Sequence, residues 1–232
     1  MFGIKTQVSK FTKNVLGSFL NGNLTNKFSI KHLMENFRVD EEGHRANTKN
    51  ADLGYGWIHY SLIRVLKPKH LLCIGSGYGF VPAVMAQACK DAGVGHVDFV
   101  DPGYGPGDLN HWTGQAFWKS NEGKSIFEKF GLKKWITHYL MENSKFAQKR
   151  RREYGYIYID GDHSVEGVSL DFELFWPRLI DGGVMLFHDI CVKGNRPEGK
   201  YGVKRFWKGI SKRSAISFEF SKSGLGVLQK KQ

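Results

Sequence analysis

Cysteine is scarce in this chain, and long apolar runs are missing. The 232 residues contain three cysteines, Cys73, Cys89 and Cys191, which stand far apart and form no CxxC pair. A disulfide framework and a cysteine zinc cluster are therefore not expected, and the composition favours a reducing, cytoplasmic location. Apolar runs stay well below the ~20 residues that a membrane-spanning helix needs, so we predict no span.

Acidic residues are missing from the first 34 positions, where five lysines stand. Apolar residues recur there every three or four positions from Ile4 to Phe19, which predicts a basic amphipathic helix. We assign residues 1–49 to an N-terminal helical extension that caps the domain, contacts another copy in a homo-oligomer, or lies on a membrane surface. Over the whole chain 34 Lys and Arg face 22 Asp and Glu, and this net charge of +12 indicates an acidic partner of unspecified class.

Residues 50–232 are assigned to one α/β domain. Apolar stretches of strand type alternate there with stretches of helical spacing, which predicts a mostly parallel sheet covered on both faces. The expected strands are His70–Gly75, His96–Asp101, Trp135–Leu140, Tyr156–Asp160, Gly183–Phe187, Ala215–Phe220 and Gly224–Gln229. The expected helices are Asn50–Pro68, Val81–Lys90, Gln115–Phe130, Ser144–Arg152, Val165–Leu179 and Val203–Ser211. The last two strands are separated by a hairpin-length turn, so one of them should run antiparallel at an edge of the sheet.

A glycine-rich turn follows the first expected strand. It connects this strand to a helix in the pattern GxGxG, formed by Gly75, Ser76, Gly77, Tyr78 and Gly79. Phe80 stands where a dinucleotide-binding motif has its third glycine. Such a turn lets backbone N–H groups approach a ligand, although a tight strand-to-helix corner alone also explains it. Asp101 ends the second strand, where a carboxylate can bind ribose hydroxyls, so the two features together predict a nucleoside-containing cofactor.

Histidines and carboxylates follow the fourth and fifth expected strands. Asp160, Asp162 and His163 come directly after one strand, and His188 and Asp189 end the next. Consecutive strands often neighbour each other, and in an open α/β sheet ligands bind at the carboxyl ends of the strands. We therefore expect these side chains to meet at one edge, although Asp162 is also well placed to cap the helix that follows.

Two segments carry a family resemblance. The run IDGDHSVEGVSLDFELFWPRLIDGGVMLFHDI, with LLCIGSGYG before it, resembles class I S-adenosylmethionine-dependent methyltransferases. It is more closely similar to small O-methyltransferases that act on glycosylated natural products and cell-surface sugars. The resemblance extends from about Asn50 to Gln232. It implies a Rossmann-like, doubly wound, seven-stranded sheet, mostly parallel, with an antiparallel strand in a C-terminal hairpin.

The resemblance also implies which residues bind S-adenosylmethionine. The methionine part would pass Gly75, Ser76, Gly77 and Gly79, the ribose would lie at Asp101 and Pro102, and the adenine would lie at Glu142, Asn143 and Ser144. One position departs from the family pattern, because Cys73 stands where these enzymes usually have an acid. The cofactor's amino group must then be bound elsewhere, by Asp160 or a backbone carbonyl.

Methyl transfer to an alcohol needs a base or a metal ion that removes the hydroxyl proton. His163 and His188 are the candidate bases, with Asp160 and Asp189 beside them, and His163 is preferred. The same two carboxylates are candidate ligands for Mg²⁺, since related enzymes include metal-dependent members. The resulting hypothesis is an O-methyltransferase for a small, sugar-bearing or anionic acceptor.

Three other functions stay open. An RNA methyltransferase would suit the net charge and the basic run Lys149–Arg152, although no RNA-binding motif accompanies them. A non-catalytic binding protein would explain Cys73, and a nicotinamide-dependent dehydrogenase is disfavoured by Phe80. The aromatic segment Gly103–Trp118 is either an acceptor lid or part of the core.

Overall fold

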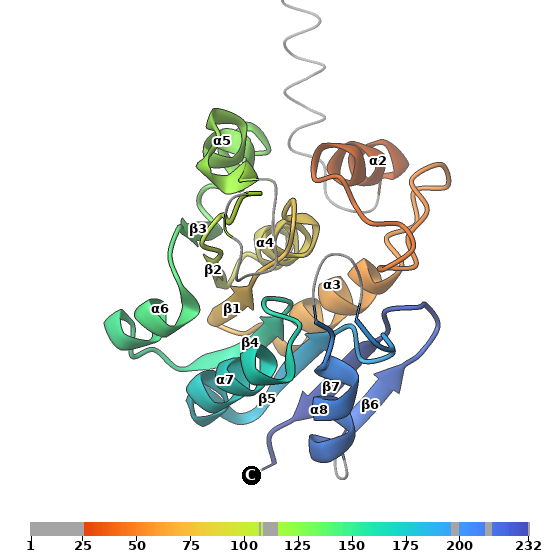
Figure 1. Cartoon of the computed structure of the whole chain (residues 1–232). Coiled ribbons are helices and arrows are strands. Elements are labelled where there is room, and N and C mark those ends of the chain that lie inside the picture. Colours follow the sequence, from red (N-terminus) through yellow and green to blue (C-terminus); the bar gives the residue numbers. More distant parts are fainter. Residues whose placement is uncertain (1–25, 107, 109–115, 196–199, 212–214, 232) are drawn as a thin grey trace, which may run out of the picture.

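The computed structural model describes residues 26–106, 108, 116–195, 200–211 and 215–231. Their centre is a seven-stranded sheet with the order β3-β2-β1-β4-β5-β7-β6 (Figure 1). The strands are β1 (His70–Ile74), β2 (His96–Val100), β3 (Ile136–Tyr139), β4 (Tyr154–Ile159), β5 (Leu179–His188), β6 (Ala215–Phe218) and β7 (Leu225–Gln229). Each expected strand is present, with its ends moved by a few residues.

The sheet is parallel from β3 through β5, and β7 then pairs antiparallel with both β5 and β6. The prediction of one antiparallel strand is confirmed, but its expected place at the edge is wrong. β7 lies inside the sheet and β6 forms the edge. The burial pattern gives the reason, because four of the five β7 residues are buried, whereas β6 has none fully buried. The more apolar strand takes the inner position.

Helices cover both faces of the sheet (Figure 1). One face carries the helices α2 (Lys27–Asn36), α3 (Tyr55–Leu66), α4 (Phe80–Ala92) and α5 (Asn121–Lys129), and the other carries α6 (Asn143–Lys149), α7 (Val165–Phe175) and α8 (Val203–Ile210). Two short 3₁₀ turns, Phe117–Lys119 and Trp176–Arg178, complete these connections. Because β1 and β4 are covered on both faces, nearly all of their residues are buried and apolar.

Helix α7 begins at the tip of β4, and its start differs from the expectation. Ser164 is the N-cap, and its hydroxyl accepts a hydrogen bond from the Gly167 N–H. Asp162 instead accepts from the Ser164 N–H at 2.9 Å, one step earlier in the turn. The prediction of Asp162 as the cap is therefore wrong by two residues. The Asp162 turn leads the chain from the strand tip into the capped helix.

The N-terminal extension divides into two parts. The expected amphipathic helix between Ile4 and Phe19 lies outside the described residues. Helix α2 is described, and its apolar residues Ile30, Leu33 and Met34 are buried in the same core as β1 and α4. In the described part of the chain, no helix is long and apolar enough to cross a membrane.

Candidate active site

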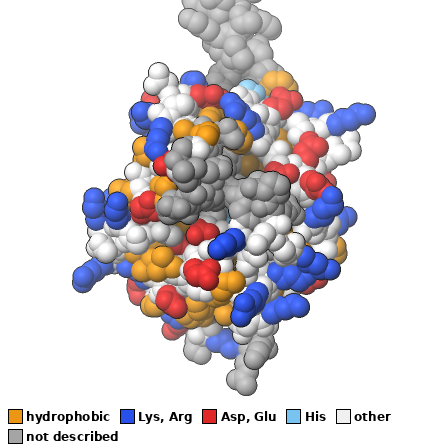
Figure 2. Space-filling model, in the orientation of Figure 1, with side chains coloured by type: hydrophobic (Ala, Val, Ile, Leu, Met, Phe, Trp, Pro, Cys, Tyr) orange, Lys and Arg blue, Asp and Glu red, His pale blue; other side chains and the backbone are white. Residues whose placement is uncertain are grey.

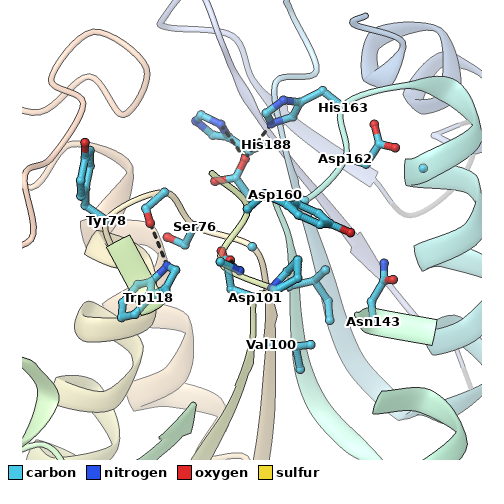
Figure 3. Close-up of a pocket in the computed structure, with 18 of the residues that line it drawn as sticks. Ser76, Tyr78, Val100, Asp101, Trp118, Asn143, Asp160, Asp162, His163 and His188 are labelled. Carbon is cyan, nitrogen blue, oxygen red and sulfur yellow. Dashed lines mark hydrogen bonds and ion pairs between the residues drawn. The ribbon is translucent and has the colours of Figure 1, made fainter. Parts of the chain in front are cut away.

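A cavity of about 540 Å³ opens at the carboxyl ends of β1, β2, β4 and β5. Figure 3 shows Tyr78 and Trp118 on one side of it, Asn143 on the other, and Asp160, His163 and His188 at one end. Most of the expected site residues line this cavity: Gly75, Ser76, Gly77, Asp101, Pro102, Glu142, Asn143, Ser144, Asp160, His163, His188 and Asp189. Gly79 does not line it and packs against the Trp118 ring.

The glycine turn brings the ends of β1 and β4 together. Gly75 has a φ of 65°, and a Cβ there would lie 2.2 Å from the Asp160 carbonyl oxygen, so no larger residue fits. The Trp118 indole N–H donates to the Gly77 carbonyl at 2.9 Å and fixes the far side of the turn. Trp118 is 2% exposed and packs in the core, so it is not a mobile lid residue. Trp112 and His111 of the aromatic segment lie outside the described residues.

Cys73 is completely buried below this turn. Its thiol donates to the Gly75 carbonyl at 3.3 Å, and burial raises the pKa of the thiol well above its usual value. The thiol is therefore a neutral structural donor inside the turn. A negatively charged acceptor for an amino group is not formed at this position.

Acidic and amide groups line the cofactor half of the cavity. The Asp101 carboxylate accepts from the Gly103 N–H at 2.7 Å, and burial raises its pKa to about 6. At the other end Asn143 donates to the carboxyl group of Asp171, which is completely buried on α7. The Asn143 side-chain oxygen accepts from the Ser144 N–H. These contacts fix an acceptor at the expected ribose position and an amide at the expected adenine position.

His163 lies between the two strand-tip carboxylates. Its Nε2 atom is 3.3 Å from Asp160 Oδ1 and 3.2 Å from Asp189 Oδ2. Tyr158 holds the other oxygen of Asp160, because its hydroxyl donates to Oδ2 at 3.0 Å. Asp189 has a φ of 60°, an uncommon backbone conformation for a residue with a side chain. The adjacency of β4 and β5 thus brings together the residues that the sequence analysis expected to meet.

His188 contacts the same carboxylates from a different side. Its Nδ1 atom is 3.4 Å from Asp160 Oδ1 and 3.4 Å from Asp189 Oδ1. Burial alone would lower the pKa of His188, but the carboxylates of Asp189 and Asp160 outweigh it and hold the pKa well above its usual value. Burial would likewise raise the pKa of Asp160, but His188 and His163 hold it below its usual range. The two carboxylates therefore favour the protonated, cationic form of His188.

The donor atoms of this cluster fit Mg²⁺ poorly. One ligand atom each from Asp160, His163 and Asp189 lies within 4.8 Å of the others, which is a spacing that a metal ion can bridge. However, the set contains an imidazole nitrogen, whereas Mg²⁺ prefers oxygen ligands. The cationic ring of His188 also lies beside both carboxylates. Mg²⁺ stays a prediction that this arrangement disfavours, and we derive no step through it.

Six lining residues come from segments that the sequence analysis did not connect with the site. They are Phe37, Arg38, Asp40, His44, Tyr201 and Ser223. The His44 ring stacks on His188 with centroids 4.6 Å apart, and Tyr201 stacks on His163 at 4.8 Å. None of the six belongs to a recognisable motif. The sequence offered one indication of them, the aromatic and histidine residues Phe37, His44 and Tyr201 in otherwise polar segments.

The parallel sheet with an antiparallel β7, the glycine turn after β1 and the acid after β2 define the fold of class I S-adenosylmethionine-dependent methyltransferases. A family model described as a methyltransferase domain, Methyltransf_24, matches residues 72–190, just over half of the chain. The chain therefore belongs to this methyltransferase family.

Individual relatives are distant. Uncharacterized protein y4gI of Sinorhizobium fredii is 26% identical over 191 residues, or 80% of this chain, but the chain spans only 20% of that protein's length. The O-methyltransferase of Bacillus cereus in complex with SAH has a TM-score of 0.59 at 15% identity and covers 87% of this chain and 90% of its own. The O-methyltransferase TomG of Streptomyces achromogenes, solved with SAM, has a TM-score of 0.60 at 13% identity and covers 89% of each chain. At these identities the solved structures support the fold alone.

Proposed function

We propose that the protein is an S-adenosylmethionine-dependent O-methyltransferase that uses His163 as its general base. The observation that carries this proposal is the position of His163 Nε2, which lies on the cavity wall between Asp160 and Asp189. The Gly75 turn touches the Asp160 backbone, so the base and the expected cofactor site share one cavity. Because Nε2 faces two carboxylates, it is the donor nitrogen of this ring, and Nδ1 is the nitrogen that would take the proton of an acceptor hydroxyl.

The chain's residues supply alignment and proton transfer. S-adenosylmethionine, when bound, supplies an activated methyl group on a positively charged sulfur. The glycine turn and Asp101 would hold the cofactor, so that the acceptor oxygen lies in line with the methyl group. His163 removes the hydroxyl proton, and the adjacent carboxylates stabilise the imidazolium that forms. Tyr158 keeps the Asp160 carboxylate oriented toward this ring.

The charges of the cavity favour an acceptor that is neutral at its reacting end. Among the described residues, its lining contains one arginine, Arg38, and six acids, Asp40, Asp101, Glu142, Asp160, Asp162 and Asp189. The positive charge lies elsewhere, and Figure 2 shows Lys and Arg side chains over the outer surface, with several at the lower right, over the region of α8. A sugar-bearing compound with several hydroxyls suits this lining better than an anion.

The basic run after α6 does not favour an RNA acceptor. Arg150 donates to the Tyr139 hydroxyl at 2.8 Å, and Arg152 pairs with the buried Asp98 at 3.4 Å. Two of its four basic side chains thus stabilise the fold. This run is therefore less available for phosphate contacts than its composition indicates.

The first test is calorimetric titration with S-adenosylhomocysteine, followed by methyl transfer from labelled S-adenosylmethionine to sugar nucleotides and glycan extracts. We expect binding of the product and label in a sugar-bearing compound. His163→Ala should keep the binding and lower the transfer rate by about 10²-fold or more. The control is His96→Ala, at the opposite end of β2 from Asp101. Absence of product binding by folded protein would refute the cofactor, and a wild-type rate in His163→Ala would refute the base.

A further inference from the structure

The two strand-tip carboxylates need a positive partner. The Asp189 side chain is 7% exposed and that of Asp160 is 13% exposed, so both are largely removed from water. Buried carboxylates are stable only when they are paired or hydrogen-bonded. Related methyltransferases with acids at these positions include metal-dependent members, so a divalent ion is one solution for this pair. The structure offers another.

Both nitrogens of His188 face oxygen acceptors. Nδ1 lies 3.4 Å from one oxygen of each carboxylate, and Nε2 lies 3.3 Å from the Gly43 carbonyl oxygen. A carbonyl or an ionised carboxylate has no proton to give, so both ring nitrogens must carry one for these contacts to be favourable. The His188 imidazolium thus occupies a position next to both negative charges.

The segment before α3 holds this ring in place. The His44 ring stacks on it at 4.6 Å with an interplanar angle of 23°. The Gly43 carbonyl also accepts from the Ser221 hydroxyl at 3.1 Å, and the Gly43 N–H donates to Asp40. The Gly43 Cα thus packs closely against the Asp40 carboxylate and the Ser223 hydroxyl. The ring is therefore fixed on one face and at both nitrogens.

We propose that the side chain of His188, and not a divalent metal ion, balances the charge of Asp160 and Asp189 in this enzyme. This proposal rests on the proposed function in one respect, because the charge sum includes the positively charged sulfur of S-adenosylmethionine. At the strand tips themselves, two carboxylates, one imidazolium and one sulfonium sum to zero. A divalent ion there would add two positive charges beside the imidazolium and the sulfonium, which is unfavourable.

The experiment is a titration of the full chain with Mn²⁺, followed by electron paramagnetic resonance, with Mg²⁺ as competitor. We expect no Mn²⁺ binding to the wild type at this cluster below about 1 mM. The variant His188→Asp exchanges the cation for an oxygen ligand and should bind Mn²⁺ at least about a hundredfold more tightly. The matched control is His163→Asn, which removes the other imidazole of the cluster. It keeps His188 and should not gain a site.

Two results would overturn the proposal. One is stoichiometric Mn²⁺ or Zn²⁺ binding to the wild type in the micromolar range that is lost in Asp160→Asn. The other is equal gain of Mn²⁺ binding in His163→Asn and His188→Asp. The wild-type titration alone shows whether micromolar binding occurs at all, and Asp160→Asn then assigns that binding to this cluster. Binding of S-adenosylhomocysteine, measured in parallel, separates failure of this proposal from failure of the proposed function.

Discussion

Replacing Asp171 by asparagine should stabilise the protein at neutral pH. Asp171 is 0% exposed, Asn143 donates to its Oδ1 atom, and its Oδ2 atom has no hydrogen-bond partner among the described residues. Burial raises the pKa of this carboxyl to about 8, although the hydrogen bond from Asn143 acts in the opposite direction. The carboxyl is therefore protonated in the folded protein at neutral pH and ionised in the unfolded chain.

The size of the effect follows from proton linkage. The pKa of Asp171 is higher in the folded protein than in the unfolded chain. Asp171 therefore costs no free energy of unfolding below about pH 4, and the cost grows as the pH rises toward 8. At pH 7 this cost is about 4 kcal/mol in the free energy of unfolding, because each pH unit above the unfolded pKa contributes ~1.4 kcal/mol and pH 7 lies ~3 units above it. Asp171→Asn keeps an oxygen for Asn143 and does not titrate. It should recover most of this free energy, which corresponds to roughly 10 °C in Tm for a domain of this size.

The assay is urea unfolding of the wild type and Asp171→Asn at pH 5, 6, 7 and 8. The difference in the free energy of unfolding should grow by about 1.4 kcal/mol per pH unit in favour of the variant. Asp181→Asn, which changes an exposed carboxylate on β5, is the control and should give no such slope. An equal difference at pH 5 and pH 8 would show that Asp171 is ionised in the folded protein and would refute the reasoning.

Two further predictions concern the cofactor site. Gly75→Ala should abolish S-adenosylhomocysteine binding in calorimetry, because its Cβ would lie 2.2 Å from the Asp160 carbonyl oxygen. The control is Gly93→Ala, at a similar φ of 70° but with open space around it. This variant should keep the binding and lose ~1 kcal/mol in stability. Comparable loss of binding in both variants would contradict a special role of Gly75. Burial raises the pKa of Asp101 to about 6, so product affinity should fall by about tenfold per pH unit below pH 6. Asp101→Asn should bind the product weakly and with no dependence on pH. A pH dependence that survives in Asp101→Asn would assign it to another group.

The sequence predicted the parts of the site that depend on strand order. The turn at Gly75, Asp101 and the pair His163 and Asp189 all follow buried apolar strands, and the ends of parallel strands meet at one edge. Their mutual distances could not be predicted, because these depend on strand register and on the turn at Asp189. The exact ends of the helices could not be predicted either, because they depend on which side chain reaches the first N–H groups of the helix. Helix α7 begins where the Ser164 hydroxyl, and not the Asp162 carboxylate, reaches the helix N–H groups.

The roles of the two strand-tip histidines could not be separated from sequence. Both follow apolar strands, and both were candidate bases. Their surroundings differ through a long-range contact, since His188 Nε2 faces the Gly43 carbonyl, 145 residues away in the chain. Neither the turn at Gly43 nor His44 has a periodic pattern that would have linked it to β5. Only the packing of α2 and the following turn against the core brings them there.

The cavity is therefore built by two parts of the chain with different roles. Residues within the matched range 72–190 supply the glycine turn, Asp101, Asn143 and the strand-tip cluster. Residues before and after that range, from Phe37 to His44 together with Tyr201 and Ser223, line the same cavity. The first group contains every residue expected to bind the cofactor, so acceptor choice should depend on the second. Under the proposed function, the turn that would face the acceptor also contacts the His188 ring, so we expect acceptor recognition to be coupled to the charge balance of Asp160 and Asp189. Residues 26–49 thus pack on the same core as the sheet, and Gly43 and His44 of this segment contact the His188 ring.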